Sequence, residues 1–78
     1  NQPQIIVVNT AVPRPWKDAN NAIISKVASR YPNVRLVDWD RVSKDRPELF
    51  APDGVHLSPA GSDVYVDLVL SVISKTSL

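Results

Sequence analysis

Two short, strand-like segments separated by a helical pattern constrain the fold of this chain more than any other feature. Residues 5–8 read Ile-Ile-Val-Val, without polar alternation, which is typical of a strand buried on both faces in a parallel sheet. Residues 34–38 form the second segment and predict a second strand. Between them, from about residue 17 to residue 30, apolar residues recur at the helical period. A strand, a helix and a strand joined by short connections predict two parallel strands with a right-handed crossover.

Prolines indicate a loop after the first predicted strand. Residues 10–16 contain Pro13 and Pro15, and neither helix nor central strand fits them, because proline lacks an amide donor and restricts the residue before it. Further along, residues 39–52 show no clear period. We expect this stretch to be irregular, with one short helix at about residues 47–50.

A second long helix is predicted from about residue 59 to residue 75. Ser58 is a good N-cap and Pro59 suits the first helical position. Apolar stripes at helical spacing run along both predicted helices, and we expect both stripes to be core. They consist of Ile23, Ile24, Val27, Ala28 and Tyr31 in the first helix, and of Val64, Tyr65, Leu68, Val69, Val72 and Ile73 in the second.

These elements do not make a complete fold. Two parallel strands with apolar faces need further strands beside them and helices on both sides, because otherwise their edges and faces meet water. With 78 residues the chain is one domain at most, and a domain of this size buries only roughly 60–65% of its unfolded surface. We therefore expect an α/β fold: residues 1–78 are the C-terminal β-α-β-α part of a flavodoxin-like, doubly wound parallel sheet with three α/β/α layers, incomplete in this chain. The start at Asn1, not methionine, agrees with a piece of a longer polypeptide.

Composition excludes several classes of function. The chain has no cysteine and one histidine, so neither disulfides nor a thiolate or histidine-rich metal site is expected, and no cofactor is implied. Asp38, Asp40, Asp53 and His56 could in principle bind a metal ion, but carboxylates so loosely spaced are weak evidence for a metal site. Asp38 is better interpreted as a cap or brace of its loop. The nine basic and eight acidic residues are scattered, which argues against nucleic acid as a partner. No apolar run approaches the roughly 20 residues that span a bilayer.

The chemistry of the chain is concentrated in Asp53 and His56. They place a carboxylate and the only imidazole three residues apart, just before a helix. A histidine that moves a proton needs its other ring nitrogen held by an acceptor, and Asp53 can supply one. The alternative is a simple Asp-Gly turn followed by a polar residue that helps to begin the helix. None of the serines lies in the sequence context of a nucleophile.

The flanking residues favour the catalytic alternative. Residues 53–61, Asp-Gly-Val-His-Leu-Ser-Pro-Ala-Gly, resemble the last sequence block of the SGNH, or GDSL-type, hydrolase family. The resemblance implies a Ser-His-Asp triad in which His56 is the general base and acid and Asp53 orients it. In that family the nucleophile lies in a Gly-Asp-Ser segment after the first strand, and two middle blocks form the oxyanion hole. Those blocks are absent here, so residues 1–78 resemble the C-terminal segment of one SGNH-type domain, and this segment alone is predicted to be inactive.

A narrower resemblance involves three further parts of the sequence. Residues 8–16, Asn20 or Asn21, and the Val-Asp-Trp of residues 37–39 are similar to the extracytoplasmic SGNH domain of bacterial peptidoglycan O-acetyltransferases. This implies acetyl transfer through a serine ester to a cell-wall sugar hydroxyl, for example the C6 hydroxyl of N-acetylmuramic acid. The implied partners are the serine-bearing N-terminal segment, the cell-wall glycan and a membrane acyltransferase domain. The parent protein would hold the segment outside the cytoplasm, attached to the membrane.

Two alternatives to the transferase stay open. With the same triad, the protein could be a hydrolase of carbohydrate or lipid esters. If it has the fold but no catalytic activity, it could be a carbohydrate-binding or scaffolding module. No substrate-binding residue is assigned. Arg14 is better interpreted as a solvated loop residue than as a substrate contact. Trp16 and Trp39 could stack on a sugar, but burial as loop anchors is favoured for side chains of that area.

Overall fold

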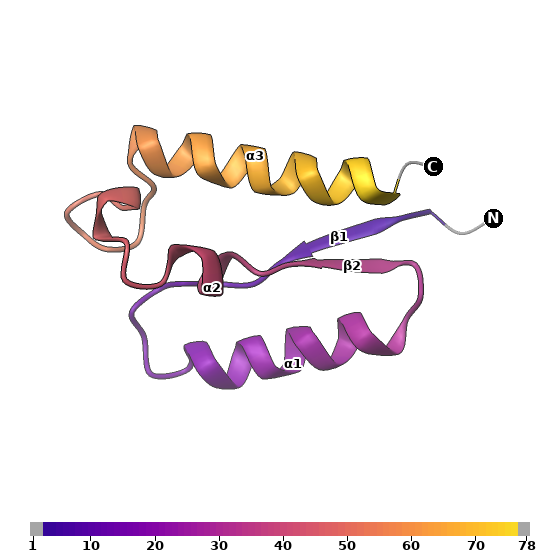
Figure 1. Ribbon diagram of the computed structural model, residues 1–78. Helices are drawn as coiled ribbons and strands as arrows, with labels where there is room; N and C mark the ends of the chain where they lie inside the picture. Colours follow the sequence, from indigo (N-terminus) through magenta and orange to yellow (C-terminus); the bar gives the residue numbers. More distant parts are fainter. Residues whose placement is uncertain (1–2, 77–78) are drawn as a thin grey trace.

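Two parallel strands form the sheet of the computed structural model, which describes residues 3–76. Strand β1 (Ile5–Val8) pairs with β2 (Val34–Val37) in a register that places Ile5 opposite Val34 and Val8 opposite Val37. The crossover helix α1 (Lys17–Arg30) and the last helix α3 (Pro59–Thr76) lie on opposite sides of the sheet (Figure 1). The described part is therefore a small α/β unit, and the expected order and parallel pairing are confirmed.

The segment after β2 is more regular than the sequence predicted. Helix α2 (Trp39–Ser43) begins directly after the strand, and a 3₁₀ helix, η1 (Pro47–Leu49), follows where the short helix was expected. Asp38 does not continue β2, because its carboxylate accepts the amide N–H of Arg41 at 3.2 Å and caps α2. The prediction of an irregular stretch was therefore wrong for residues 39–43 and confirmed for the short helix.

Helix α3 begins as the sequence predicted. Pro59 is its first residue, and the Ser58 hydroxyl accepts the amide N–H of Gly61 at 3.1 Å, which satisfies one of the free donors of the first turn. The carbonyl of Ser58 accepts the amide of Ser62 at 2.8 Å. Within residues 3–76 no helix, α3 included, is both long and apolar enough to cross a membrane.

The core lies near the carboxyl ends of the strands. Val37, Trp39 and Leu49 are the buried large apolar side chains, with Val37 fully excluded from solvent. The Trp39 ring lies edge-on to Tyr65, with 5.1 Å between ring centroids, and tilted against Phe50 at 6.0 Å. Such aromatic pairs add to the free energy of area burial. Trp39 thus anchors α2 between η1 and α3, as expected.

Apolar burial is much less extensive than predicted. Ile5 is 46% exposed, and the rest of β1 is half-buried, so the expectation of a strand buried on both faces is wrong for this chain. Trp16, expected to be buried, is 52% exposed. The reason is geometric: within residues 3–76, β1 has a strand on one side only, and two helices cannot enclose a two-stranded sheet. Parts of the two stripes expected to be core are likewise exposed, at Ile23, Val27, Tyr31 and Ile73.

Candidate active site

The loop that carries Asp53 and His56 connects η1 to α3 at the carboxyl end of the sheet (Figure 1). Phe50 and Leu57 form an isolated antiparallel bridge that closes the loop. Val55 and Leu57, on either side of His56, line the same small cavity as residues 8–12 at the end of β1. The loop therefore lies at the edge where open α/β sheets place their ligands.

Asp53 and His56 are in direct contact. Nδ1 of the imidazole lies 2.5 Å from Oδ2 of the carboxylate. The other carboxylate oxygen, Oδ1, accepts the amide N–H groups of Val55 at 2.8 Å and of His56 at 3.0 Å. Gly54 has φ +71°, a left-handed conformation that glycine adopts without steric cost. The turn itself therefore sets the carboxylate against the ring.

The charges of the two side chains stabilise each other. The hydrogen bond from His56, followed by those from two backbone amides, lowers the pKa of Asp53 to about 2. The same carboxylate raises the pKa of His56, through its hydrogen bond first and its charge second. The imidazole is 81% exposed and the carboxylate 46% exposed. An ion pair in such contact with solvent contributes little to stability.

The contact also decides which ring nitrogen can react. In the neutral ring, a proton on Nδ1 is donated to Asp53, and Nε2 keeps the lone pair that can take a proton from a hydroxyl. No hydrogen bond connects Nε2 with another group of residues 3–76. Four serine hydroxyls donate hydrogen bonds to backbone carbonyls: those of Ser29, Ser43, Ser58 and Ser71. Among the described residues, Nε2 is therefore available to accept a proton from an outside group.

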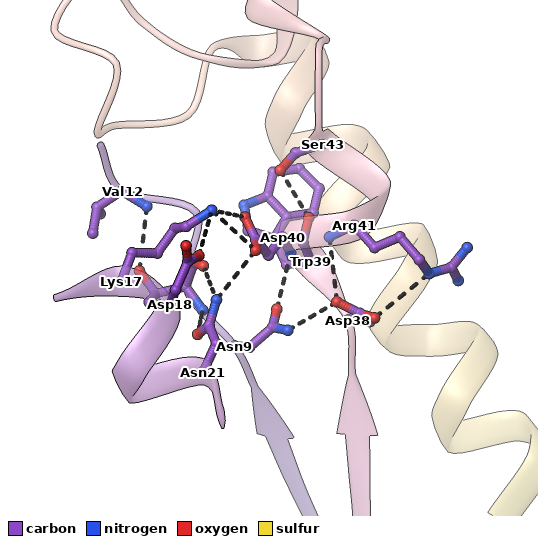
Figure 2. A network of polar contacts seen from close by, with 11 residues as sticks. Asn9, Val12, Lys17, Asp18, Asn21, Asp38, Trp39, Asp40, Arg41 and Ser43 are labelled. Atoms are coloured by element: carbon purple, nitrogen blue, oxygen red, sulfur yellow. Dashed lines mark hydrogen bonds and ion pairs between the residues drawn. The ribbon is translucent and has the colours of Figure 1, made fainter. Parts of the chain in front are cut away.

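A polar network connects the carboxyl ends of the two strands (Figure 2). The side-chain amide of Asn9, just after β1, donates to Asp38 Oδ1 at 2.8 Å, and its oxygen accepts the amide N–H of Asp40 at 2.9 Å. The hydrogen bond from Asn9 is the largest cause of the lowered pKa of Asp38, ahead of the bond from Arg41. Asp38 thus caps and braces, as expected. Sequence reasoning missed the role of Asn9, although an amide directly after a buried strand was a usable signal.

The same network connects the proline-containing loop to α1 (Figure 2). Asn21, and not Asn20, accepts the amide N–H of Thr10 at 2.9 Å and donates to the Thr10 carbonyl at 2.7 Å. Asn21 also donates to Asp40 at 3.3 Å, and the ammonium of Lys17 lies 3.0 Å from the same carboxylate. The hydrogen bond to Asp40 raises the pKa of Lys17. These contacts hold the loop after β1 beside the carboxyl end of β2.

The other candidate residues do not converge on the pair. No group of three or more His, Asp or Glu side chains suited to a metal ion occurs among residues 3–76. The guanidinium of Arg14 donates to the carbonyl of Pro13 at 3.2 Å and is exposed, as expected of a solvated loop residue. Trp39 is too buried to stack on a ligand, whereas Trp16 is exposed. Pro13 lies beside Gly54, so the proline-containing loop passes next to the Asp-Gly turn.

Comparison with known proteins identifies relatives of this chain. No family model matches it. Peptidoglycan O-acetyltransferase OatA of Listeria monocytogenes is 49% identical over 71 residues, which are 91% of this chain. Putative peptidoglycan O-acetyltransferase YrhL of Bacillus subtilis is 39% identical over 71 residues, also 91% of the chain. O-acetyltransferase OatA of Staphylococcus aureus is 41% identical over 69 residues, 88% of the chain.

These relatives are much longer than the chain. The matched segment spans 11% of the length of each of the three. The similarity therefore concerns one segment of each relative, and this segment includes the Asp53–His56 loop. Over about nine-tenths of its length, the chain is a homologue of a segment of bacterial peptidoglycan O-acetyltransferases.

Proposed function

We propose that this chain supplies the histidine and the aspartate of a Ser-His-Asp triad that transfers an acetyl group to a hydroxyl of a cell-wall sugar. The observation that carries the proposal is the 2.5 Å contact between His56 Nδ1 and Asp53 Oδ2, with Nε2 unbonded among the described residues. The names of the relatives support acetyl transfer and peptidoglycan as the acceptor. The geometry supports the acid–base half of that chemistry.

In the proposed mechanism, His56 moves one proton in each half of the reaction. Its Nε2 takes the proton of a serine hydroxyl from another segment while the serine oxygen attacks the carbonyl of the acetyl donor. The imidazolium, stabilised by Asp53, then gives that proton to the leaving group, and the acetyl ester of the serine remains. In the second half, Nε2 takes the proton of the sugar hydroxyl as it attacks the ester. The proton returns to the serine oxygen, and the acetyl group stays on the sugar.

The proposal includes the rest of the domain. Residues 1–78 would be the C-terminal segment of one SGNH-type domain with a flavodoxin-like, three-layer sheet, and an N-terminal segment would bring the serine to the Asp53–His56 pair. The exposure of Ile5 and the single pairing edge of β1 support an added strand beside β1. In the parent protein, a membrane acyltransferase domain would hold this domain outside the cytoplasm, where the glycan lies.

The test uses a longer protein that contains this segment and the residues before it. With an aryl acetate as donor and a chitooligosaccharide as acceptor, mass spectrometry should detect acetylated sugar. The variant His56→Ala should reduce the rate on the order of a thousandfold or more. Asp67→Asn is the control for general effects of surface substitution, because Asp67 is an exposed residue of α3. Activity of His56→Ala within tenfold of the unmodified protein would exclude the triad.

The nature of the acceptor and of the nucleophile is tested in the same preparation. If acetate is released and no acceptor gains acetyl mass, the protein is a hydrolase, with water in place of the sugar. A serine-directed fluorophosphonate should label one serine outside residues 1–78. Labelling of a serine of this chain would overturn the division of the triad between two segments. Failure of both labelling and turnover would favour the non-catalytic, glycan-binding alternative.

A further inference from the structure

The Asp53–His56 pair is formed by its own loop, so its position relative to the rest of the molecule must be set by other residues. The carboxylate, the two amides that it accepts and the imidazole all belong to residues 53–56. A turn closed in this way keeps its internal geometry when it moves as a unit. For a proton transfer, however, the distance from the imidazole to an outside hydroxyl matters as much as the contact within the pair.

Ser58 connects the loop to η1 through both its backbone and its side chain. Its hydroxyl donates to the carbonyl oxygen of Glu48 at 2.6 Å, and its amide N–H donates to the carbonyl oxygen of Leu49 at 3.0 Å. The same hydroxyl accepts the amide N–H of Gly61 at 3.1 Å, as the cap of α3. One residue therefore connects η1, the loop and the start of α3, only two positions after His56.

Gly61 allows this approach. A Cβ atom at position 61 would collide with the carbonyl oxygen of Leu49 and lie 2.7 Å from its carbonyl carbon. Any other residue must therefore push α3 away from η1. Leu49 cannot yield easily, because its side chain is 1% exposed in the core. Absence of a side chain at Gly61 thus sets how closely the first turn of α3 lies against η1.

We infer that Ser58 and Gly61 are positioning residues that set the place of the His56 imidazole, through the contact of the loop and α3 with the carbonyls of Glu48 and Leu49. This inference rests on the proposed function of His56. A further bond, from the amide of Ala51 to the carbonyl of His56 at 2.8 Å, closes the loop but involves no side chain. Ser58 and Gly61 are therefore positions where a substitution can change the placement of the loop while the hydrogen bonds within residues 53–56 stay in place.

The experiment separates the formation of the pair from its placement. In the longer active protein, Ser58→Ala should lower kcat roughly tenfold to a hundredfold, because small misplacements of a reacting group have effects of that size. The KM for the acceptor and the NMR-derived pKa of His56 should stay unchanged, because the turn of residues 53–56 is intact. Ser58→Thr keeps the hydroxyl and should restore most of kcat. Gly61→Ala should resemble Ser58→Ala.

Ser71→Ala is the matched control. The Ser71 hydroxyl also donates to a backbone carbonyl, that of Leu68 at 2.7 Å, but lies in α3 away from the loop. Its removal should leave kcat unchanged. Hydrogen exchange of the backbone amide at position 58, which donates to Leu49, should accelerate in Ser58→Ala and Gly61→Ala but not in the control, whether or not the protein turns over substrate.

Several results would overturn the inference. A kcat within twofold for Ser58→Ala, together with a large loss for His56→Ala, would reject the positioning role and leave the triad standing. A raised KM with unchanged kcat would make Ser58 a substrate contact, and a pKa of His56 that falls to its ordinary value would place Ser58 within the pair itself. If both Ser58→Ala and His56→Ala keep full activity, the proposed function itself is rejected. If Ser58→Ala fails to fold, the kcat values of Gly61→Ala and Ser58→Thr provide the same test: a lowered kcat in the first and a nearly normal kcat in the second support the positioning role.

Discussion

At the scale of single residues, one short turn produces both the geometry and the charge of the site. One carboxylate oxygen of Asp53 accepts hydrogen bonds from two backbone amides, and the other oxygen contacts Nδ1 of the imidazole. The left-handed conformation of Gly54 makes this turn possible. Sequence spacing alone could not distinguish this arrangement from a common Asp-Gly turn, because both begin with the same two residues. The contact to His56 Nδ1 is the feature that separates them.

If His56 is the general base, as proposed, its raised pKa sets the pH dependence of activity. A general base acts in its neutral form, so a raised pKa moves the rising limb of the kcat/KM profile to higher pH. Asp53→Asn removes the largest cause of that shift, and the limb should move to lower pH, toward the ordinary histidine value of about 6.5. The rate should also fall on the order of ten-thousandfold, because an amide no longer fixes the ring tautomer. The measurement is a pH profile of kcat/KM for both proteins.

A matched control guards against effects of net charge. Asp63→Asn removes one negative charge from an exposed position of α3 and should leave the limb in place. An unchanged limb in Asp53→Asn, or an equal movement in Asp63→Asn, would contradict the assignment of Asp53 as the partner of the imidazole.

At the scale of elements, periodicity predicted the long elements and missed the short one. The helices α1 and α3 are long enough for the helical spacing of apolar residues to repeat over several turns, and both strands contain several apolar residues. Helix α2 has five residues, too few for a period to be visible, and it depends on the cap by Asp38 and on Asn9, which follows the neighbouring strand β1. That pairing spans 31 residues of sequence, so no local pattern contains it. The core predicted for α1 and α3 was wrong only for part of each stripe, because helical spacing identifies apolar residues but not the elements that cover them.

Asn9 provides a stability prediction for the start of α2. The variant Asn9→Ala leaves the Asp38 carboxylate and the Asp40 amide without their shared partner, and it should lower the free energy of unfolding by about 1–3 kcal/mol. Urea denaturation followed by circular dichroism measures the effect. Asn20→Ala is the control, since Asn20 is exposed and its neighbour Asn21 makes the side-chain bonds. Equal effects of the two variants would show that Asn9 does not support α2.

At the scale of the whole molecule, exposed apolar side chains gather along both long helices. Ile23, Val27 and Tyr31 follow each other at intervals of four residues and form a stripe along α1, which we call the outer stripe. On α3, Val66, Leu70 and Ile73 are exposed as well. Contiguous apolar surface of this kind marks an interface more often than free protein surface. In the proposed complete domain, further strands and helices would cover this surface, and the apolar stripes would be buried as their spacing predicts.

If residues that precede this segment in a longer protein complete the domain, as proposed, they should cover the outer stripe. The chain contains no cysteine, so Val27→Cys places a single thiol in the stripe. In the 78-residue chain, where Val27 is 44% exposed, a maleimide should label this thiol readily. In the longer protein, labelling at the same position should slow at least tenfold, because apolar surface of the added segment would lie against α1. Lys26→Cys, on the neighbouring exposed position of the same helix, should be labelled at similar rates in both proteins. Equal labelling of Val27→Cys in both would mean that the outer stripe faces solvent in the complete domain, and that the added segment lies elsewhere.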